Sequence, residues 1–248
     1  MIVEMARTEP RWGYTSIRDR LRNLGYHVSR ATIAKVLKEH GLEPAPQRGR
    51  QRSWASFLKT QWAGIAAMDF TTVEVWTRGG LITYYVAFVM ELATRKVTCA
   101  GITPHPDGSW MQQIARNLTD VVTGFLRGKR FLVIDRDALY ASGFMRLIEQ
   151  AGIQPVRIPP SAPNCNAHLE RFNGSFKREA ADRVIFFGES HLQRVIDEYL
   201  DHYHRERNHQ GLDNKIIEPG NDIGRTNGNI RRRERLGGMF HYYYRDAA

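Results

Sequence analysis

Three runs rich in β-branched and aromatic residues follow one another between residues 63 and 103, and this succession limits the fold of the chain more than any other feature. The runs read AGIAAMDFTTVEVWT, LITYYVAFVMELAT and RKVTCAGIT, and glycine or charged residues separate them. Strand-forming residues bounded by such turns favour strands that pair with their neighbours in sequence. The pattern therefore predicts three consecutive antiparallel strands.

Helical and strand patterns alternate between residues 107 and 205. Asp107 is the predicted cap of a helix whose apolar residues recur every three or four positions and are expected in the core: Trp110, Ile114, Leu118, Val121 and Phe125. After it come predicted strands at 131–135 and 154–158 and predicted helices at 143–150, about 165–181 and 190–205. This order predicts an α/β fold in which helices flank a mixed five-stranded sheet.

Two short helices are predicted before residue 45, with a turn between them. Their apolar stripes are Ile17, Leu21 and Leu24 in the first helix and Ile33, Ala34, Val36 and Leu37 in the second. Thr15 or Ser16 is expected to cap the first helix and Ser29 the second, while Gly25 and Gly41 end them. The second helix then presents an outward side suited to the major groove of DNA: Arg30, Thr32, Lys35 and Lys38. The alternative is a plain helical hairpin with a solvated basic face.

The charge of the chain favours a polyanionic partner. The 36 lysines and arginines outnumber the 26 acidic residues by 10, and seven of those ten excess charges lie in residues 1–60, with 12 basic and five acidic side chains. Such an excess favours nucleic acid, because phosphate contacts release counterions; a basic surface that only keeps the chain soluble is the alternative. The longest apolar stretch, Tyr84 to Met90, is too short to span a bilayer, and the two cysteines suggest no disulfide framework, so we expect a cytoplasmic protein.

Three acidic residues lie where the predicted layout can bring them together. Asp69 lies inside the first predicted strand, in the apolar context AAMDFTTV, where a charge is costly unless something binds it. Asp135 ends the fourth strand, next to the first, and Glu170 lies 35 positions later on a helix. Carboxylate oxygens suit Mg²⁺ or Mn²⁺. Two such ions about 4 Å apart could promote displacement at a phosphodiester.

The strings MDFTTVEVW, FLVIDRDALY and PPSAPNCNAHLERFNGSFKRE resemble the catalytic core of DDE integrases and insertion-sequence transposases, in the retroviral-integrase superfamily. The resemblance runs from about residue 11 to residue 238. It implies a ribonuclease H-like fold and cutting of mobile-element ends in double-stranded DNA with Mg²⁺, followed by attack of the freed 3′-hydroxyl on target DNA. Asp69, Asp135 and Glu170 match the metal-binding triad of that family, and a homo-oligomer on DNA is implied.

The helix that carries Glu170 has a predicted polar face and a predicted apolar face. Glu170, Asn173 and Lys177 share one face. Asn173 is expected to contact DNA, and Lys177 matches a DNA-contacting lysine of the family. In the preceding loop, Asn164 and Asn166 are expected to contact DNA or to cap the loop. The opposite face is expected to dock on the sheet with three apolar residues: Leu169, Phe172 and Phe176.

Several alternatives stay open. Asp137 competes with Asp135 as the second acid, and we favour Asp135 because it ends the strand. The chain could instead be a ribonuclease H-like nuclease or resolvase that cuts without joining, or an inactive DNA-binding relic.

The expected domains are a helix-turn-helix segment at 1–45 that could be truncated, a basic linker at 46–61, a catalytic core at 62–207 and a basic, aromatic tail at 208–248. We expect the tail to lie along DNA or to pack on a neighbouring subunit.

Overall fold

A computed structural model of the chain describes residues 1–9, 12–42, 60–158 and 166–246. The chain divides into two units, Met1–Trp62 and Ala63–Ala248. Residues 46–59 of the predicted linker lie outside the described residues. None of the described helices is both long enough and apolar enough to cross a membrane.

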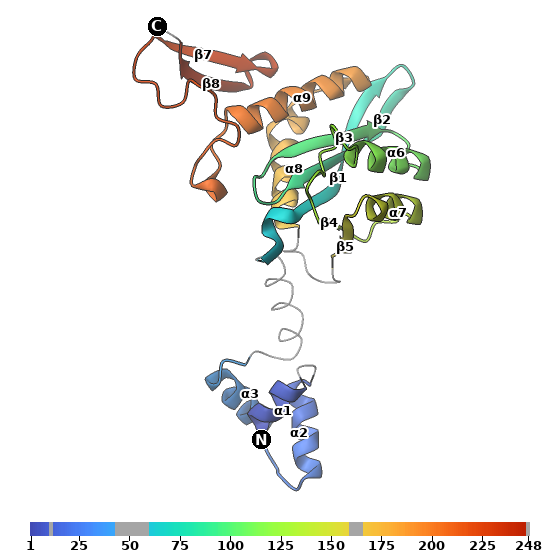
Figure 1. The fold of residues 1–248 in the computed structure, drawn as a ribbon, viewed down its shortest axis with the longest axis vertical. Helices are drawn as coiled ribbons and strands as arrows, with labels where there is room; N and C mark the ends of the chain where they lie inside the picture. The colour runs from blue at the N-terminus through green and yellow to red at the C-terminus, as the bar shows by residue number, and fades with distance from the viewer. Residues whose placement is uncertain (10–11, 43–59, 159–165, 247–248) are drawn as a thin grey trace. The chain divides into compact units, whose positions relative to one another are not determined.

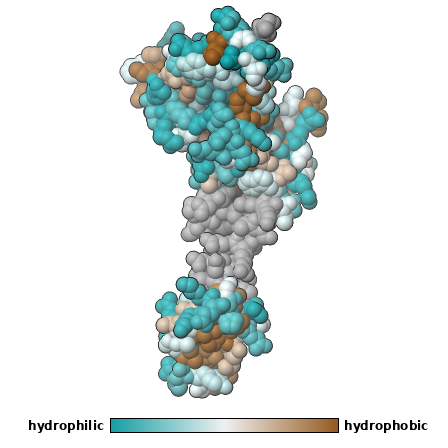
Figure 2. Space-filling model, turned by 90° about the vertical axis from the view of Figure 1, so that its left-hand side faces the viewer, coloured by the Kyte–Doolittle hydropathy of each residue, from teal (hydrophilic) through white to brown (hydrophobic). Residues whose placement is uncertain are grey.

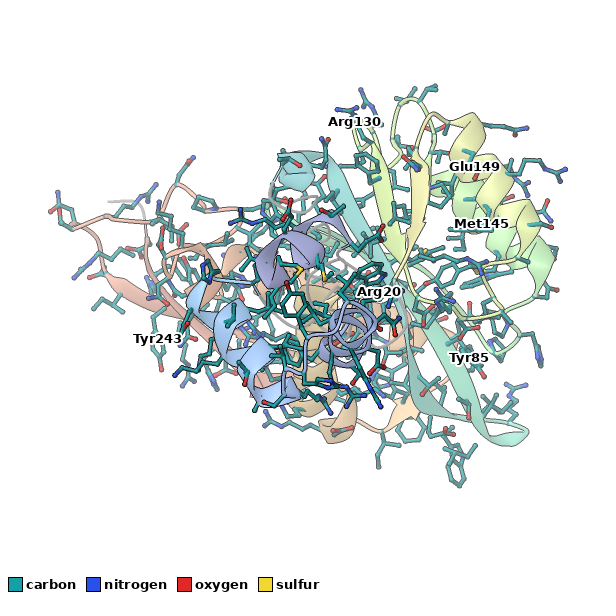
Figure 3. The ribbon with its side chains drawn as sticks, turned by 90° about the horizontal axis from the view of Figure 1, so that it is seen from below. Arg20, Tyr85, Arg130, Met145, Glu149 and Tyr243 are labelled. Carbon is teal, nitrogen blue, oxygen red and sulfur yellow. The ribbon has the colours of Figure 1, made fainter. Side chains whose placement is uncertain are left out.

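The first unit is a group of three helices, α1 (Ile2–Thr8), α2 (Tyr14–Asn23) and α3 (Arg30–Glu39). They enclose a small apolar core: Ala6, Ile17, Leu21, Ile33 and Leu37. The guanidinium of Arg20, labelled in Figure 3, lies 3.6 Å from the centroid of the Trp12 ring. Apolar side chains also reach the surface of this unit (Figure 2), where Met1, Tyr26 and Val28 help to line a groove.

The ends of α2 and α3 test the predicted caps. Ser29 caps α3 as predicted, because its Oγ accepts a hydrogen bond of 3.0 Å from the Thr32 N–H. Gly25 and Gly41 follow the two helices with φ of +82° and +65°, the left-handed conformation that favours glycine. The predicted Thr15 or Ser16 cap is wrong, since α2 begins one residue after Gly13 and no side chain caps it.

Leu24 was expected in the core of this unit but is exposed, because it lies at the C-terminal cap of α2 rather than on its buried face. The helix α1 was not predicted; it is seven residues long and fully buries only Ala6, while Ile2, Val3 and Met5 pack against the core in part.

The second unit is built on a mixed sheet with strand order β3-β2-β1-β4-β5 (Figure 1). Its strands are β1 (Ile65–Thr77), β2 (Gly80–Glu91), β3 (Val97–Thr103), β4 (Phe131–Ile134) and β5 (Gln154–Arg157). The first three pair antiparallel, whereas β4 runs parallel to β1 and β5 parallel to β4. A two-residue strand, β6 (Phe186–Phe187), also pairs with β1. The predicted ribonuclease H-like sheet is confirmed, together with its three leading antiparallel strands.

Helices cover both faces of this sheet (Figure 1), and one apolar cluster joins it to α6 (Gly108–Leu118) and α7 (Ser142–Gln150). Residues at even positions of β1 and β4 point into that cluster: Ala66, Met68, Leu132 and Ile134. Side chains alternate along a strand, so the odd positions, Asp69 among them, face the other side.

That other side is covered by α8 (Ala167–Glu179) and α9 (Glu189–Arg205). Leu169, Phe172 and Phe176 of α8 are buried, as predicted. The rings of Phe172 and Phe176 meet Phe88 of β2 edge-on, with centroids 5.0 and 5.3 Å apart. Between α9 and β3, the Val97 N–H donates a hydrogen bond of 3.0 Å to Nε2 of the buried His204.

The helix α6 approaches β3 at a glycine. A Cβ atom added to Gly101 would lie 2.6 Å from Cδ1 of Ile114 and 3.1 Å from the Trp110 ring. Asp107 caps α6 as predicted, with the Trp110 N–H 2.7 Å from its Oδ1. The helix ends at Leu118, so the prediction that Val121 belongs to the core is wrong, because that side chain is exposed.

Part of the predicted tail forms a hairpin of β7 (Ile230–Arg235) and β8 (Phe240–Arg245). Two of its arginines, Arg233 and Arg235, donate hydrogen bonds of 3.2 and 2.9 Å to the buried Glu206 after α9. Tyr243, labelled in Figure 3, is exposed. These two arginines pair within their own chain, and the expectation that the tail lies along DNA or packs on a neighbouring subunit stays a prediction. Short 3-10 turns complete the unit at Trp62–Gly64, Ala181–Arg183, Gln210–Leu212 and Leu236–Gly238.

We predict that Gly101→Ala destabilises the chain by about 1–3 kcal/mol, because the added methyl overlaps Cδ1 of Ile114. Ile114→Val removes that atom, so the double variant should recover part of the loss. Urea denaturation of the four proteins measures this coupling. An equal effect of Gly101→Ala with Ile114 and with Val at position 114 would contradict the described packing.

The buried His204 should make stability depend on pH. Burial lowers the pKa of His204 to about 4, whereas a histidine in an unfolded chain titrates near pH 6.5. The unfolded chain therefore binds the proton first, and the stability due to the neutral ring, present above about pH 6.5, is lost as the pH falls toward 4. His204→Gln keeps an acceptor for Val97 and cannot titrate, so thermal denaturation from pH 7 to pH 4 should show a shallower loss in that variant. Identical pH slopes would contradict this role.

Candidate active site

Asp69 lies on β1 with its carboxylate toward α8. Its Oδ1 accepts a hydrogen bond of 2.9 Å from the Phe70 N–H, and its Oδ2 accepts one of 2.9 Å from the Asn173 side-chain amide. Burial raises the pKa of Asp69 to about 6, and the negative charges of Asp135 and Glu170 add to that rise, while the two hydrogen bonds lower it. The pKa of Asp69 thus depends on the charges of both other predicted acids.

Asp135 follows the last residue of β4, where the parallel register brings it level with Asp69. Ile65 pairs with Phe131 and Ala67 with Val133, an offset of 66 positions that would next align Asp69 with Asp135. The Asp137 N–H donates a hydrogen bond of 3.0 Å to Oδ1 of Asp135. Asp135 therefore lies at the C-terminal end of β4, beside Asp69 of β1.

Asp137 lies in the turn after Asp135 and is exposed. Its Oδ1 accepts a hydrogen bond of 2.9 Å from the Leu139 N–H, which is the local bond of a turn residue. The charge of Asp135, by contrast, is among those that raise the pKa of Asp69. These contacts favour Asp135 over Asp137 as the partner of Asp69.

Glu170 lies in the first turn of α8 and is exposed. One turn later, Asn173 is buried and its amide reaches Asp69, so this contact sets the polar face of α8 against β1. Asn173 was predicted to contact DNA, and the structure instead gives its amide a partner inside the protein. The signal was present in the sequence, because Asn173 shares a helix face with Glu170 at a spacing of three residues.

The three acids form a concentration of negative charge. Among the described residues, no lysine, arginine or histidine forms an ion pair with any of them. Among the residues that the structure describes, no group of three His, Cys, Asp or Glu side chains is arranged to hold a metal ion. Asp135 and Glu170 therefore lie close enough to Asp69 to raise its pKa, but the three carboxylates are not arranged as the ligands of one metal ion.

Tyr140 closes the apolar side of this site, a contact that the sequence did not reveal. Its hydroxyl donates a hydrogen bond of 3.3 Å to the carbonyl oxygen of Met68, the residue before Asp69. Burial raises the pKa of Tyr140, with the charges of Asp135 and Asp69 adding to the rise, so the phenol stays a neutral donor. Tyr140 thereby fixes the backbone that carries Asp69.

The remaining predicted contact residues are spread over both units. Asn164 lies outside the described residues, and Asn166 is buried, with no hydrogen-bond partner for its Oδ1 among the residues described. Lys177 is half-buried and helps to line a groove beside Glu74 and Trp76 rather than the acids. In the first unit, four predicted side chains on α3 are all exposed: Arg30, Thr32, Lys35 and Lys38. The Thr32 hydroxyl lies 2.8 Å from Ser29 Oγ and so belongs to the helix cap.

Two family models match the chain. The model described as "Integrase core domain" matches residues 151–216, and the model described as "HTH-like domain" matches residues 2–51. The first match begins before α8 and includes Glu170, while the second includes α1, α2 and α3.

The chain is also similar to proteins encoded by insertion elements. It is 26% identical over 217 residues to the insertion element IS476 uncharacterized 39.2 kDa protein of Xanthomonas euvesicatoria, covering 84% of this chain and 60% of that protein. It is 25% identical over 227 residues to the insertion element IS407 uncharacterized 31.7 kDa protein of Burkholderia multivorans, covering 85% of this chain and 76% of that protein. The chain thus spans less than two thirds of the first relative.

Solved structures that are similar to the chain include two integrase catalytic cores. One is the HTLV-2 integrase catalytic core domain in complex with magnesium, at 10% identity and a TM-score of 0.46, covering 62% of this chain and 93% of that chain. Another is the catalytic core domain of BIV integrase, at 19% identity and a TM-score of 0.42, covering 60% of this chain and 88% of that chain.

The strand order of the second unit, the two matching family models and the two insertion-element relatives agree with one another. Together they support the resemblance of the chain to DDE integrases and insertion-element transposases.

Proposed function

We propose that this chain cuts double-stranded DNA at the ends of a mobile element and joins the freed 3′-hydroxyl to target DNA, using Mg²⁺ or Mn²⁺. The observation that carries the proposal is the electrostatic contact of Asp69 with Asp135 and Glu170 on the α8 side of the sheet. Similarity to insertion-element proteins supports the choice of DNA as substrate.

The donor set fits a hard divalent cation. Asp69, Asp135 and Glu170 supply carboxylate oxygens, which Mg²⁺ and Mn²⁺ prefer. Near them, Oδ1 of the buried Asn173 has no hydrogen-bond partner among the described residues. Two such ions, held by the three acids, would favour ionisation of the attacking hydroxyl and stabilise the leaving oxygen of a phosphodiester.

The rest of the chain orients these acids. Asn173 and the Phe70 N–H occupy one lone pair on each oxygen of Asp69, which fixes the carboxylate plane and leaves the other lone pairs available. Glu170 is exposed, and half-buried Asp135 has one carboxylate oxygen held by the Asp137 N–H. Asn173 is therefore a positioning residue for Asp69.

The first unit supplies a second function in the proposal, recognition of the element end. Exposed Arg30, Lys35 and Lys38 on α3 offer positive charge to the phosphates and bases of a major groove. We assign residues 1–45 to this task, 62–207 to catalysis and 208–248 to support of α9. Because two element ends must be held at once, we propose a homo-oligomer on DNA, acting in the cytoplasm at the nucleoid.

Loss of any one acid should stop the chemistry while DNA binding persists. We expect Asp69→Asn, Asp135→Asn and Glu170→Gln each to lower nicking by at least about 100-fold, the order found when a charge-stabilising group is removed from an active site. Asp137→Asn, a matched control two residues from Asp135, should keep most activity. The measurement is product formation from element-end duplex and supercoiled plasmid with Mg²⁺, with nicked and joined products separated on gels.

Undiminished nicking by Asp69→Asn or Glu170→Gln would refute the assignment of the acids. Loss of activity in Asp137→Asn but not in Asp135→Asn would make Asp137 the second acid. Nicked product without any joined product would favour a nuclease, and binding without nicking under any divalent ion would favour an inactive relic.

Substitution on α3 should affect recognition and spare the fold of the first unit. Arg30→Ala and Lys35→Ala remove exposed charges without touching its core, so we expect unchanged melting temperatures and weaker binding of element-end duplex. A contact to a base costs about 1–3 kcal/mol when lost. Arg22→Ala, at an exposed position on α2, is the control. Fluorescence anisotropy measures the binding, and equal losses in all three variants would argue against α3 as the recognition helix.

A further inference from the structure

A basic cavity of ≈ 340 Å³ lies on another side of α8 from Asp69. It is bounded by α8, by the turn between β2 and β3, and by the residues that follow α9. Three arginines, Arg95, Arg171 and Arg207, line it together with His168 and His209. None of the described residues that line it is acidic, so the cavity is suited to an anion.

Arg95 occupies a conformation that its side chain does not favour. It lies in the β2–β3 turn with φ of 62°, in the left-handed region where glycine or asparagine is usual. Its Nη1 donates a hydrogen bond of 2.5 Å to the Leu92 carbonyl oxygen, which holds the half-buried guanidinium at the cavity. An arginine kept at a strained turn position suggests that the side chain, not the turn, is what the position requires.

The positive groups of the cavity repel one another. Burial lowers the pKa of Arg95, and the charge of Arg171 contributes to the fall. Burial also lowers the pKa of His168 to about 4, again with contributions from Arg95 and Arg171, so this ring is neutral at pH 7. An anion between these groups would relieve the repulsion.

Glu179 and Tyr199 contact the guanidinium of Arg207. Glu179 accepts a hydrogen bond of 2.5 Å from its Nη1, and the Tyr199 hydroxyl lies 3.5 Å from the same nitrogen. Within the described part of the chain, Nε and Nη2 of Arg207 make no hydrogen bond. One carboxylate thus orients Arg207 toward the cavity, and none of the described residues that line the cavity is acidic.

We propose that this cavity binds a phosphate of the DNA backbone, an inference that rests on the proposed action of the chain on DNA. Guanidinium groups match phosphate oxygens in pairs. Arg171 directly follows Glu170, which places it about 100° around α8 and about 1.5 Å along it. A strand that presents a phosphodiester to the acids therefore has another phosphate available for the far side of the same helix turn.

The test is the salt dependence of DNA binding by the full chain. Each lost phosphate contact should lower the slope of log K against log salt by about 0.9. We expect that decrease, with severalfold weaker binding, for Arg171→Gln and Arg95→Asn, and a retained slope for Arg171→Lys. Arg146→Gln removes the same charge from exposed α7 and should leave the slope unchanged. Equal slopes for Arg171→Gln and Arg146→Gln would overturn the proposal.

Two further readings make the result specific. Asparagine tolerates the left-handed φ, so Arg95→Asn should melt close to the wild-type temperature, which separates lost binding from lost folding. Phenylglyoxal modification of arginines, mapped by mass spectrometry, should show Arg171 protected by duplex DNA. Protection by inorganic phosphate at matched ionic strength, but not by duplex, would make the cavity a site for a free ion and would overturn the assignment to DNA.

The slopes are measured in the Asp69→Asn background without divalent ions, so they do not depend on cleavage. A decrease in slope for Arg171→Gln, together with a wild type that nicks DNA under no divalent ion, would support the cavity and refute the proposed function. Nicking by the wild type with an unchanged slope for Arg171→Gln would refute the cavity alone.

Discussion

The alternation of side chains along β1 and β4 decides where the acids of this protein can lie. Ala66, Met68, Leu132 and Ile134 occupy the even positions and bury themselves against α6 and α7. The odd positions, which include Asp69 in β1 and, one residue after β4, Asp135, must then face α8. A slip of one residue in either strand would turn a carboxylate into an apolar core, where an unpaired charge is costly. The apolar packing of one face thus fixes the chemistry of the other, and the parallel register of the two strands makes the two carboxylates neighbours.

The helix α8 links this sheet to everything that the chain is proposed to do. Leu169, Phe172 and Phe176 anchor the helix on the sheet, and Asn173 ties it to Asp69. With that face fixed, Glu170 lies near enough to Asp69 to raise its pKa, and Arg171 lines the basic cavity. Helical geometry leaves no independent choice, because residues one apart differ by about 100° in direction. The position of each charged group therefore follows from three buried apolar residues.

Much of this arrangement could be predicted from the sequence where the signal is local or periodic. The three leading strands, the Ser29 and Asp107 caps and the buried stripe of α8 all follow from spacing and turn chemistry. Contacts between distant segments could not be predicted in the same way. Asn173 reads equally as a DNA contact or as a partner of Asp69, and only the packing of α8 distinguishes them. The pairing of Arg233 and Arg235 with Glu206 joins residues 27 and 29 positions apart, beyond any helical or strand period. The prediction that Val121 lies in the core was wrong for another reason, since the apolar spacing continues after the helix has ended.

Two charged regions lie beside α8: the acids around Asp69 and the arginine-lined cavity. They are suited to ligands of opposite charge. Burial opposes ionisation of Asp69, and the charges of Asp135 and Glu170 add to that effect; burial likewise lowers the pKa of Arg95, and the charge of Arg171 adds to the fall. A cation on one side and a phosphate on the other would offset the repulsive part of both effects, so whatever binds the native chain there also stabilises it. Stability is thereby given up in the free chain at the positions where binding restores it, a trade that functional sites commonly make. The strained φ of Arg95 fits the same reasoning, because a turn selected for stability alone would favour glycine there. Opposite charges held apart by one helix are suited to a polyanion that must meet metal ions at one phosphate and arginines at the next.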